Sequence, residues 1–435
     1  MKNIDKTASN SIKFDTNGIP YISLRQLKSV LYIKQCSNMT KAAAELNRSQ
    51  TAITKALITL EESLNNQLFD RFSTGMKATI YGEALYKRIL LASNQFEKAG
   101  QIYEKYFTNT RKYQNIPIFS MDISYKRLSA FITLYQTLSI KSASDLLGVT
   151  KAALYSSIRQ MEEWLEIKLF DTGPNGLTPT SYCVILAKHV KLAFTEIRHG
   201  LEDLANIDGI TTGSVKVGSL PYTRTFLIPK ALNNLLIDYP NLDISTQEGP
   251  YSMMEASLRS GEIDFIVGAV RSSEDNSDIT TEVLFEDKLS IIARKGHPLA
   301  NKEQISFHEL ANQKWVLPSS QTPAWKLLEE TMRAHDVPMP QHAIQTSSLS
   351  IVRGLLIDSD RLSLLSEHQI YYDIKSQLLE ILPVEMADTY RPIGITMRKN
   401  TQPSPVAKLF LDKIRKVARD FKRSTKTSLQ EKAAL

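Results

Sequence analysis

The stretch EESLNNQLFDRF at residues 61–72 recurs as EEWLEIKLFDTG at residues 162–173. The two copies are 101 residues apart, and the same offset pairs Leu27 with Leu128 and Thr79 with Thr180 without a gap between them. A fixed offset over this length predicts a duplicated unit of structure, rather than two unrelated amphipathic helices that share a common pattern. The fold of the N-terminal half therefore follows from the fold of one copy.

Length and composition limit the class of protein. A chain of 435 residues is long enough for two to four domains. It begins without an apolar leader and offers no run of about 18 apolar residues, so we expect a cytoplasmic protein with no membrane partner. Cys36 and Cys183 are far apart, which argues against a disulfide framework or a cysteine-based zinc site and favours two small buried side chains.

The net charge of +7 is unevenly distributed. Residues 1–120 carry 17 basic and 9 acidic residues (+8), residues 121–210 carry 9 and 10 (−1), and the remainder carries 27 of each (0). A basic N-terminal unit favours a polyanionic partner such as nucleic acid, although a mildly basic solvated surface gives the same count.

The first copy has the pattern of a helix-turn-helix. Leucines at helical spacing begin at Leu24, and a second short helix is expected at Lys41–Leu46. Asn47 and Arg48 form the turn, and the Ser49 hydroxyl is placed to cap the next helix. Two helices joined by so short a turn form a helix-turn-helix.

The helix after Ser49 has the polar face of a recognition helix. Gln can bind adenine through two hydrogen bonds, Lys can reach guanine or phosphate, and the Thr methyl can pack on thymine. The segment RFSTGMKATIYG, residues 71–82, predicts the β-hairpin wing, with Gly75 at its tip. The expected DNA contacts of the first copy are Thr40, Arg48, Ser49, Gln50, Thr51, Thr54, Lys55, Arg71 and Thr79, of which Thr40, Arg48 and Arg71 are assigned to phosphates.

These residues carry a family resemblance. TKAAAELNRSQTAITKALITLEESLNNQLFDR, residues 40–71, resembles the N-terminal signature of LysR-type transcriptional regulators. Thr51 stands where the family usually has Pro, a change that the first turn of a helix tolerates. The resemblance implies a winged helix-turn-helix that binds double-stranded promoter DNA.

The second copy departs further from the family pattern. Thr150 is placed to cap its recognition helix and Gly148 suits the turn, but Thr172 replaces the phosphate-contacting Arg. Three roles stay open: an auxiliary DNA reader, a degenerate module for dimer or intramolecular packing, and a regulatory cover for the first copy. The candidate DNA contacts are Thr150, Lys151, Tyr155, Ser156 and Arg159.

A long helix follows each copy. Residues 180–207 have apolar residues at helical spacing, so this helix needs a second surface to cover its apolar stripe. The resemblance implies a linker helix that pairs two subunits into a homodimer or homotetramer, with packing on its own domain as the alternative. The equivalent first-copy helix, within residues 82–107, is expected to connect the two winged helices as a spacer.

From Gly213 onward, strands alternate with helices. The strands SVKVGSL, LDISTQEG and DFIVGAV are separated by helical segments, which predicts a parallel sheet in two α/β half-domains with a ligand in the cleft between them. This region resembles the periplasmic-binding-protein-like effector domain of LysR-type regulators. Residues 219–232, 264–271 and 348–369 resemble the subgroup related to the galactose-binding-protein regulator, which makes a sugar or small organic acid plausible as effector.

Polar turns before helices supply the candidate effector ligands. Helix N-terminal amides favour oxygen-rich or anionic groups, and Arg side chains pair with carboxylates, although a structural salt bridge is the alternative for Arg271 and Arg353. The candidates are Tyr222, Thr223, Arg224, Arg271, Ser319, Ser320, Gln321, Thr322, Ser347, Ser348 and Arg353.

The sequence thus predicts a multi-domain protein of mixed α+β and α/β class. Its parts are a first winged helix-turn-helix with trailing helix (21–110), a second (122–180), a linker or dimerisation helix (181–208), an effector-binding domain (213–420) and a flexible tail (421–435).

The function that follows is transcription regulation. We expect a sequence-specific DNA-binding regulator that a small molecule controls, with RNA polymerase as a further contact. The alternative is a ligand-independent architectural DNA-binding protein with a vestigial cleft. No HExxH, phosphate-binding glycine loop or GxSxG motif is present, so an enzyme, a metal site and a cofactor are not expected.

Overall fold

The computed structural model describes residues 12–15, 18–107, 112–174, 176–271, 278–320, 322–386 and 389–433, with only the backbone of 423–433. The described chain forms two compact units. The first unit is built from the duplicated N-terminal half up to Gly213, with the short segments 259–262 and 401–405; the second unit contains the remaining effector region. No helix in the described part of the chain is long and apolar enough to cross a membrane.

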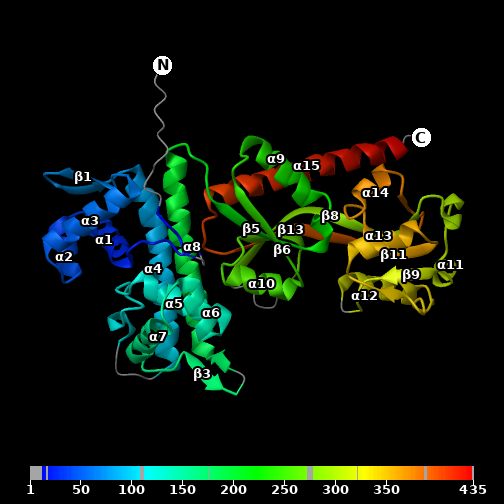
Figure 1. Cartoon of the computed structure of the whole chain (residues 1–435). Coiled ribbons are helices and arrows are strands. Elements are labelled where there is room, and N and C mark those ends of the chain that lie inside the picture. The colour runs from blue at the N-terminus through cyan, green and yellow to red at the C-terminus, as the bar shows by residue number, and fades with distance from the viewer. Residues whose placement is uncertain are drawn as a thin grey trace. The chain divides into compact units, whose positions relative to one another are not determined.

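The first copy is a three-helix unit with a β-hairpin and a long trailing helix (Figure 1). Ser49 caps α3 and Thr79 caps α4, each by accepting a backbone N–H three residues later. The hairpin pairs β1 with β2 in antiparallel register, as the predicted wing requires. The elements are α1 Leu24–Cys36, α2 Met39–Glu45, α3 Gln50–Leu64, β1 Phe69–Phe72, β2 Gly75–Ala78 and α4 Ile80–Tyr106.

The second copy repeats this order of elements. Thr150 and Thr180 cap α7 and α8 as Ser49 and Thr79 cap α3 and α4. Glu162 accepts the backbone N–H of Leu169, and its counterpart Glu61 accepts that of Leu68. The elements are α5 Tyr125–Thr137, α6 Ile140–Leu147, α7 Lys151–Leu165, β3 Phe170–Gly173, β4 Gly176–Pro179 and α8 Ser181–Ile207.

The two long helices α4 and α8 lie side by side and run antiparallel (Figure 1). Tyr81 near the start of α4 donates to Asp208 just beyond α8, whereas Tyr182 at the start of α8 donates to the carbonyl of Ala99. The apolar stripe of α8 is therefore covered by α4 of the same chain. This packing is the alternative considered for α8, and the expectation that the helix pairs two subunits stays a prediction.

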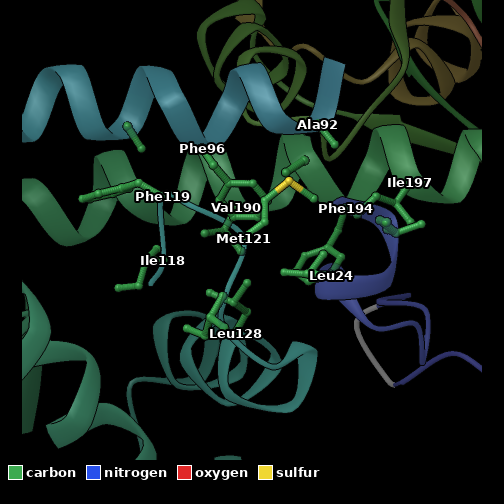
Figure 2. Packing of buried hydrophobic residues seen from close by; sticks show 14 of the residues in the cluster. Leu24, Ala92, Phe96, Ile118, Phe119, Met121, Leu128, Val190, Phe194 and Ile197 are labelled. Atoms are coloured by element: carbon green, nitrogen blue, oxygen red, sulfur yellow. The ribbon is translucent and has the colours of Figure 1, made fainter. Parts of the chain in front are cut away.

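One hydrophobic core joins both copies and both long helices. Figure 2 shows Phe96 of α4 and Phe194 of α8 packed with Met121 from the segment between the copies. Leu24 of α1 and Leu128 of α5 enter the same cluster from the two helix-turn-helix units (Figure 2). Each of these side chains is almost inaccessible to solvent, so the two copies fold as a single body.

The effector unit is built on one nine-stranded mixed sheet with the order β10-β9-β11-β8-β13-β7-β5-β6, and with β12 paired to β8. The strands are β5 Ser214–Ser219, β6 Asp243–Glu248, β7 Phe265–Ala269, β8 Ile279–Arg294, β9 Lys314–Leu317, β10 Ile344–Gln345, β11 Arg361–Ser366, β12 Leu379–Ile381 and β13 Tyr390–Arg398. The helices of the unit are α9 Leu227–Asp238, α10 Tyr251–Arg259, α11 Phe307–Ala311, α12 Pro323–Ala334, α13 Leu349–Ile357, α14 Tyr371–Lys375 and α15 Pro405–Ala433.

The two half-domains of this unit share strands β8 and β13. The predicted parallel pairing holds for β5 with β6 and β7, and for β9 with β10 and β11. An all-parallel sheet is wrong, however, because β13 lies antiparallel between β7 and β8, and β8 is also antiparallel to β11. Separate apolar cores cover the two ends of the sheet, one under α9 and α15 and the other under α11 and α12.

The C-terminal segment differs from its prediction. Helix α15 continues to Ala433, through residues 421–433 of the predicted flexible tail. The segment contains no Pro or Gly after Pro405, and its three Lys with Arg423, Leu429, Gln430, Glu431 and Ala433 favour helix. Charge alone therefore misled the prediction of the helix end.

Candidate DNA interface and effector site

The exposed face of α3 carries the predicted recognition residues together. Gln50, Thr51, Thr54 and Lys55 line one shallow surface hollow with Ile58. The opposite face of α3 holds the helix in the core through the buried residues Ile53, Leu57 and Leu60. The helix therefore presents one continuous row of hydrogen-bonding groups, with an apolar side chain at its end. Arg71 on β1 is exposed on the wing.

Other predicted DNA contacts of the first copy have partners within the protein. The Thr79 hydroxyl donates to the carbonyl of Gln67 while it caps α4, and Ser49 caps α3. Thr40 donates to the Gln50 side chain. Ser49 and Thr79 therefore serve as helix caps and Thr40 orients Gln50, while their DNA contacts stay predictions.

Arg48 also forms an ion pair within the protein. Its guanidinium lies 3.1 Å from the carboxylate of Asp122, in the segment that joins the two copies. Lys28 lies 2.7 Å from the same carboxylate, and Arg25 donates to the Asp122 backbone carbonyl. A carboxylate therefore already neutralises the Arg48 guanidinium, and the phosphate contact of Arg48 stays a prediction.

The equivalent face of α7 is exposed but chemically different. Lys151, Tyr155 and Ser156 are exposed, and Tyr155 keeps 58% of its surface accessible although it is a large aromatic side chain. Arg159 is exposed too, and it forms an ion pair with Glu163 one turn later on the same helix. Thr150 is used as the cap of α7.

In the effector unit, side chains of the turn after β5 are hydrogen-bonded to nearby backbone carbonyls. The Thr223 hydroxyl is fully buried and donates to the carbonyls of Leu220 and Val267. Arg224 donates to the Ser219 carbonyl and lies 3.1 Å from Glu248. Both residues are therefore structural, which corrects their predicted ligand contacts.

Tyr222 in the same turn is placed differently. Its ring is half-buried and packs against the cores of both half-domains. Burial raises the pKa of its phenol, so the hydroxyl stays protonated and can donate a hydrogen bond. Tyr222 is the candidate from this turn that lies at the junction of the two half-domains.

Arg353 takes the alternative considered for it, a structural ion pair, whereas Arg271 makes a cation–π contact instead. Arg353 makes a two-oxygen ion pair with the buried carboxylate of Asp373, at 2.8 and 3.0 Å from its Nε. The Arg271 guanidinium stacks over the Tyr251 ring at 4.9 Å. The ion pair with Asp373 explains why Arg353 is not a free cation for a ligand, and its predicted role is corrected.

The remaining candidates lie on two helix starts. Thr322 caps α12 and Ser348 caps α13, so their hydroxyls are already hydrogen-bonded. Ser319, Ser320 and Ser347 line the same two turns without being buried. Gln321 lies outside the described residues.

A buried polar cluster that sequence reasoning missed lies where β8 and β13 cross between the half-domains. Asp287 on β8 is opposite Arg391 on β13, and His368 Nδ1 lies 2.8 Å from one Asp287 carboxylate oxygen. Thr389 is fully buried beside the same strands, with its backbone carbonyl accepting from Leu289. Tyr222 is close enough for Asp287 and Arg391 to influence its pKa, which brings the predicted turn and this cluster together.

The cluster has unused hydrogen-bonding capacity. Among the described residues, no partner is found for the second Asp287 oxygen, His368 Nε2, the Thr389 hydroxyl or Arg391 Nε. Leaving one such group unpaired in a protein interior costs about 1–3 kcal/mol, and native proteins rarely leave several together. Little in the sequence signals this cluster, because Asp287 stands between two other charged residues, Glu286 and Lys288, and the residues it gathers are up to 169 positions apart, counting from Tyr222 to Arg391.

Two family models match this chain. The model of the bacterial regulatory helix-turn-helix protein of the lysR family matches twice, at residues 24–83 and 125–183. The model of the LysR substrate binding domain matches residues 209–419. This chain belongs to the LysR family of transcriptional regulators. Its parts are a DNA-binding helix-turn-helix region and an α/β effector domain, as the sequence predicts.

Relatives of this LysR-type regulator are themselves named transcriptional regulators. GalR of Pseudomonas putida is 28% identical over 395 residues, which cover 91% of this chain and 97% of GalR. PcaQ of Agrobacterium fabrum is 27% identical over 296 residues, which cover 68% of this chain and 95% of PcaQ. The GalR alignment is too long to omit either helix-turn-helix region of this regulator, whereas the PcaQ alignment is the length of one such region and an effector domain.

A solved structure shows the same fold. A full-length variant of OxyR from Pseudomonas aeruginosa has a TM-score of 0.52 at 20% identity, covering 68% of this chain and 97% of that chain. The similarity supports the architecture of this LysR-type regulator. The resemblance to the galactose-binding-protein-regulator subgroup stays a prediction.

Proposed function

We propose that this LysR-type regulator binds promoter DNA through α3 and the β1–β2 wing, and that a small oxygen-rich molecule at the Asp287 cluster changes this binding. The observation that carries the DNA assignment is the row Gln50, Thr51, Thr54 and Lys55 along one exposed helix face. A helix of this kind fits the major groove, where amide, hydroxyl and ammonium groups distinguish base pairs.

Cationic side chains around α3 are proposed to position this helix on DNA. Lys55 and Arg71 are exposed, and no ion pair of either is found among the described residues. Contacts of this kind to phosphates fix the register of α3 in the groove without reading sequence. They make the affinity depend steeply on salt, because bound cations release counterions from DNA.

The effector assignment rests on the unpaired groups of the Asp287 cluster. A carboxylate oxygen that lacks a donor suits a ligand hydroxyl, and Arg391 suits a ligand carboxylate. The Thr389 hydroxyl and the Tyr222 phenol supply further polar contacts beside an apolar wall. A sugar or small hydroxylated organic acid matches this set. An architectural protein with a vestigial site would have no reason to keep so many buried groups unpaired.

Control of transcription then follows from two-state binding. An effector that binds one arrangement of the regulator more tightly shifts its population, and with it the affinity for DNA or the contact with RNA polymerase. Association of chains into a homodimer or homotetramer is part of this proposal, with surfaces other than the covered stripe of α8. The protein would act in the cytoplasm, where the chromosome lies.

Binding of genomic fragments tests the DNA assignment. The intact protein is expected to enrich a specific motif, and Gln50→Ala with Lys55→Ala to weaken specific binding by about 5- to 150-fold per lost base contact. Lys314→Ala, which removes an exposed cation from the effector unit, is the matched control and should change little. A wild-type protein that enriches no motif would overturn the regulator assignment.

Thr389→Val tests the effector assignment separately. Because no partner of the Thr389 hydroxyl is found among the described residues, its removal should leave the melting temperature unchanged or slightly raised. Sugars and small hydroxy acids that raise the melting temperature of the wild type should lose that effect in Thr389→Val but keep it in Glu303→Gln, an exposed control. Ligands that stabilise all three proteins equally would place the site elsewhere.

A further inference from the structure

The pairing of α4 with α8 has internal symmetry. Arg88 of α4 lies 2.9 Å from Glu196 of α8, and both are buried. Subtracting the repeat offset of 101 from Glu196 gives Gln95, and adding it to Arg88 gives His189. These two side chains also meet, with 2.9 Å between Gln95 Oε1 and His189 Nδ1. One contact thus occurs twice, with different chemistry.

A second pair of contacts obeys the same rule. Tyr81 of α4 donates to Asp208 beyond the end of α8. The positions equivalent to Asp208 and Tyr81 are Phe107 and Tyr182, whose rings are 5.7 Å apart. When residue i contacts residue j and the equivalent of j contacts the equivalent of i, the two units are related by an approximate twofold axis. The two copies therefore associate as the two subunits of a symmetric dimer would.

The two copies paired through α4 and α8 form an internal dimer, and its two halves are held rigidly. Its halves share one hydrophobic core, and Arg88 is fully buried between the carboxylates of Glu196 and Asp203. Tyr103 of α4 also donates to the carbonyl of Leu165 at the end of α7. Two winged helices held by a flexible tether would reach sites at many separations, whereas these are held at one.

The two reading faces of the internal dimer are unlike each other. The equivalent positions, first copy and then second, are Gln50 and Lys151, Thr51 and Ala152, Thr54 and Tyr155, Lys55 and Ser156, Ile58 and Arg159, and Arg71 and Thr172. None of these six pairs is identical, although the caps and buried positions of α3 and α7 correspond. Because the exposed faces of α3 and α7 carry different side chains, they have no reason to prefer a DNA site whose two halves are an inverted repeat.

We propose that one chain reads one bipartite duplex DNA site, with two unlike half-sites at a fixed separation, α3 binding one half-site and α7 the other. This inference rests on the proposed DNA-binding function and extends it to the second copy. The exposed ring of Tyr155 supplies an apolar contact for a thymine methyl, and Lys151 at the first turn of α7 supplies a donor for guanine or phosphate.

The second half-site depends less on phosphate contacts than the first. The wing of the second copy has Thr172 in place of Arg71, and Arg159 is already paired with Glu163. Its contribution is therefore expected to vary little with salt concentration, while the contribution of the first half-site falls steeply as salt rises.

In vitro selection from random duplex DNA tests the proposal with the full chain. The wild type should enrich two unlike motifs about one helical turn, or a multiple of it, apart. Gln50→Ala with Lys55→Ala should erase base preference in one motif, and Lys151→Ala with Tyr155→Ala in the other, each with about tenfold or greater loss of affinity. Lys314→Ala should retain both motifs.

The outcomes separate this inference from the function it rests on. No enriched motif with the wild type would overturn DNA-sequence recognition altogether. If the selected motif is unchanged by Lys151→Ala with Tyr155→Ala, then α7 does not read a half-site. If the motif is an inverted repeat of one half-site, one chain does not bind two unlike half-sites. Either result would overturn only the proposal of a bipartite site bound by one chain.

A cross-link tests the internal dimer without DNA. Tyr81→Cys and Asp208→Cys, with Cys36 and Cys183 replaced by Ala, place two thiols at an accessible end of the α4–α8 pair. A short bis-maleimide should add one thiol to each of its maleimides within one chain, giving a product of monomer mass plus one linker. A product of dimer mass, or no product, would show that the pairing does not occur within one chain.

Discussion

At the scale of single residues, the most informative side chains are those that occupy equivalent positions in the two copies but differ in chemistry. Arg88 with Glu196 and His189 with Gln95 occupy equivalent places in the α4–α8 pair, yet only the first is an ion pair. Burial opposes the charge of Arg88, but the carboxylates of Asp203 and Glu196 together outweigh it and raise the pKa of the guanidinium, so Arg88 keeps its charge. The histidine contact is neutral and can be lost to protonation.

His189 makes the stability of the first unit depend on pH. Burial, followed by the positive charges of Lys188 and Lys98, lowers the pKa of His189 from 6.5 to about 4. Above pH 6.5 the imidazole is neutral in both the folded and the unfolded chain. Between pH 6.5 and about 4 only the unfolded chain binds the proton. The free energy of unfolding therefore falls by about 1.4 kcal/mol for each unit by which the pH is lowered.

The corresponding measurement is urea unfolding at a series of pH values. His189→Gln should lose less stability than the wild type between pH 6.5 and 4, by roughly 3 kcal/mol over the whole interval. His308→Gln, at an exposed position, is the control and should follow the wild type. Parallel curves for wild type and His189→Gln would mean that His189 takes up its proton in the folded state.

At the scale of secondary-structure elements, the two wings differ in how firmly they are held. Met76 on β2 donates to the carbonyl of Ser37 at the end of α1, which fixes the first wing against its helix. Gly75 at the turn has a φ of +141°, and a Cβ there would lie 2.4 Å from the same Ser37 oxygen. Its counterpart Gly176 has a φ of +103°, but a Cβ there would meet nothing within 4 Å.

Alanine substitutions at these glycines should therefore have unequal effects. Gly176→Ala carries only the strain of its backbone conformation, about 1–2 kcal/mol. Gly75→Ala adds a steric clash that displaces the wing, so its loss of stability should be larger and should be accompanied by weaker specific DNA binding. Thermal unfolding and DNA titration of both variants provide the measurement, and equal losses would show that the Ser37 contact does not hold the wing.

The elements also show what the sequence could and could not predict. Caps, apolar spacing and the repeat located α1, α3 and the wing, because each is determined by residues within about ten positions. The antiparallel placement of β13 and the partner of α8 depend on residues far apart in the chain, which periodicity does not relate. The internal partners of Arg48, Arg353 and Thr223 were not predicted for the same reason, since Asp122, Asp373 and Val267 are 20 or more positions away in the sequence.

At the scale of the whole molecule, the positive charge of the first copy is partly neutralised by one residue outside it. Asp122 lies between the copies and receives Lys28, Arg48 and Arg25. Its side chain is 30% exposed, so these interactions are only partly screened by water. The same carboxylate therefore anchors the first copy to the joining segment, and we expect it to withhold three cations from DNA phosphates.

Asp122→Asn should separate these two effects. Loss of the carboxylate is expected to lower the stability of the first unit by about 1–2 kcal/mol, because Lys28 and Arg48 lose a charged acceptor. The released cations should strengthen binding to a duplex of arbitrary sequence and steepen its salt dependence by about one unit of slope for each new phosphate contact. Anisotropy titrations over a range of about 50 to 300 mM KCl measure the slope, with Asp145→Asn at an exposed site in α6 as the control for the lost negative charge. If both variants change the slope equally, net charge alone governs attraction to DNA, and the Asp122 contacts have no special part in restraining it.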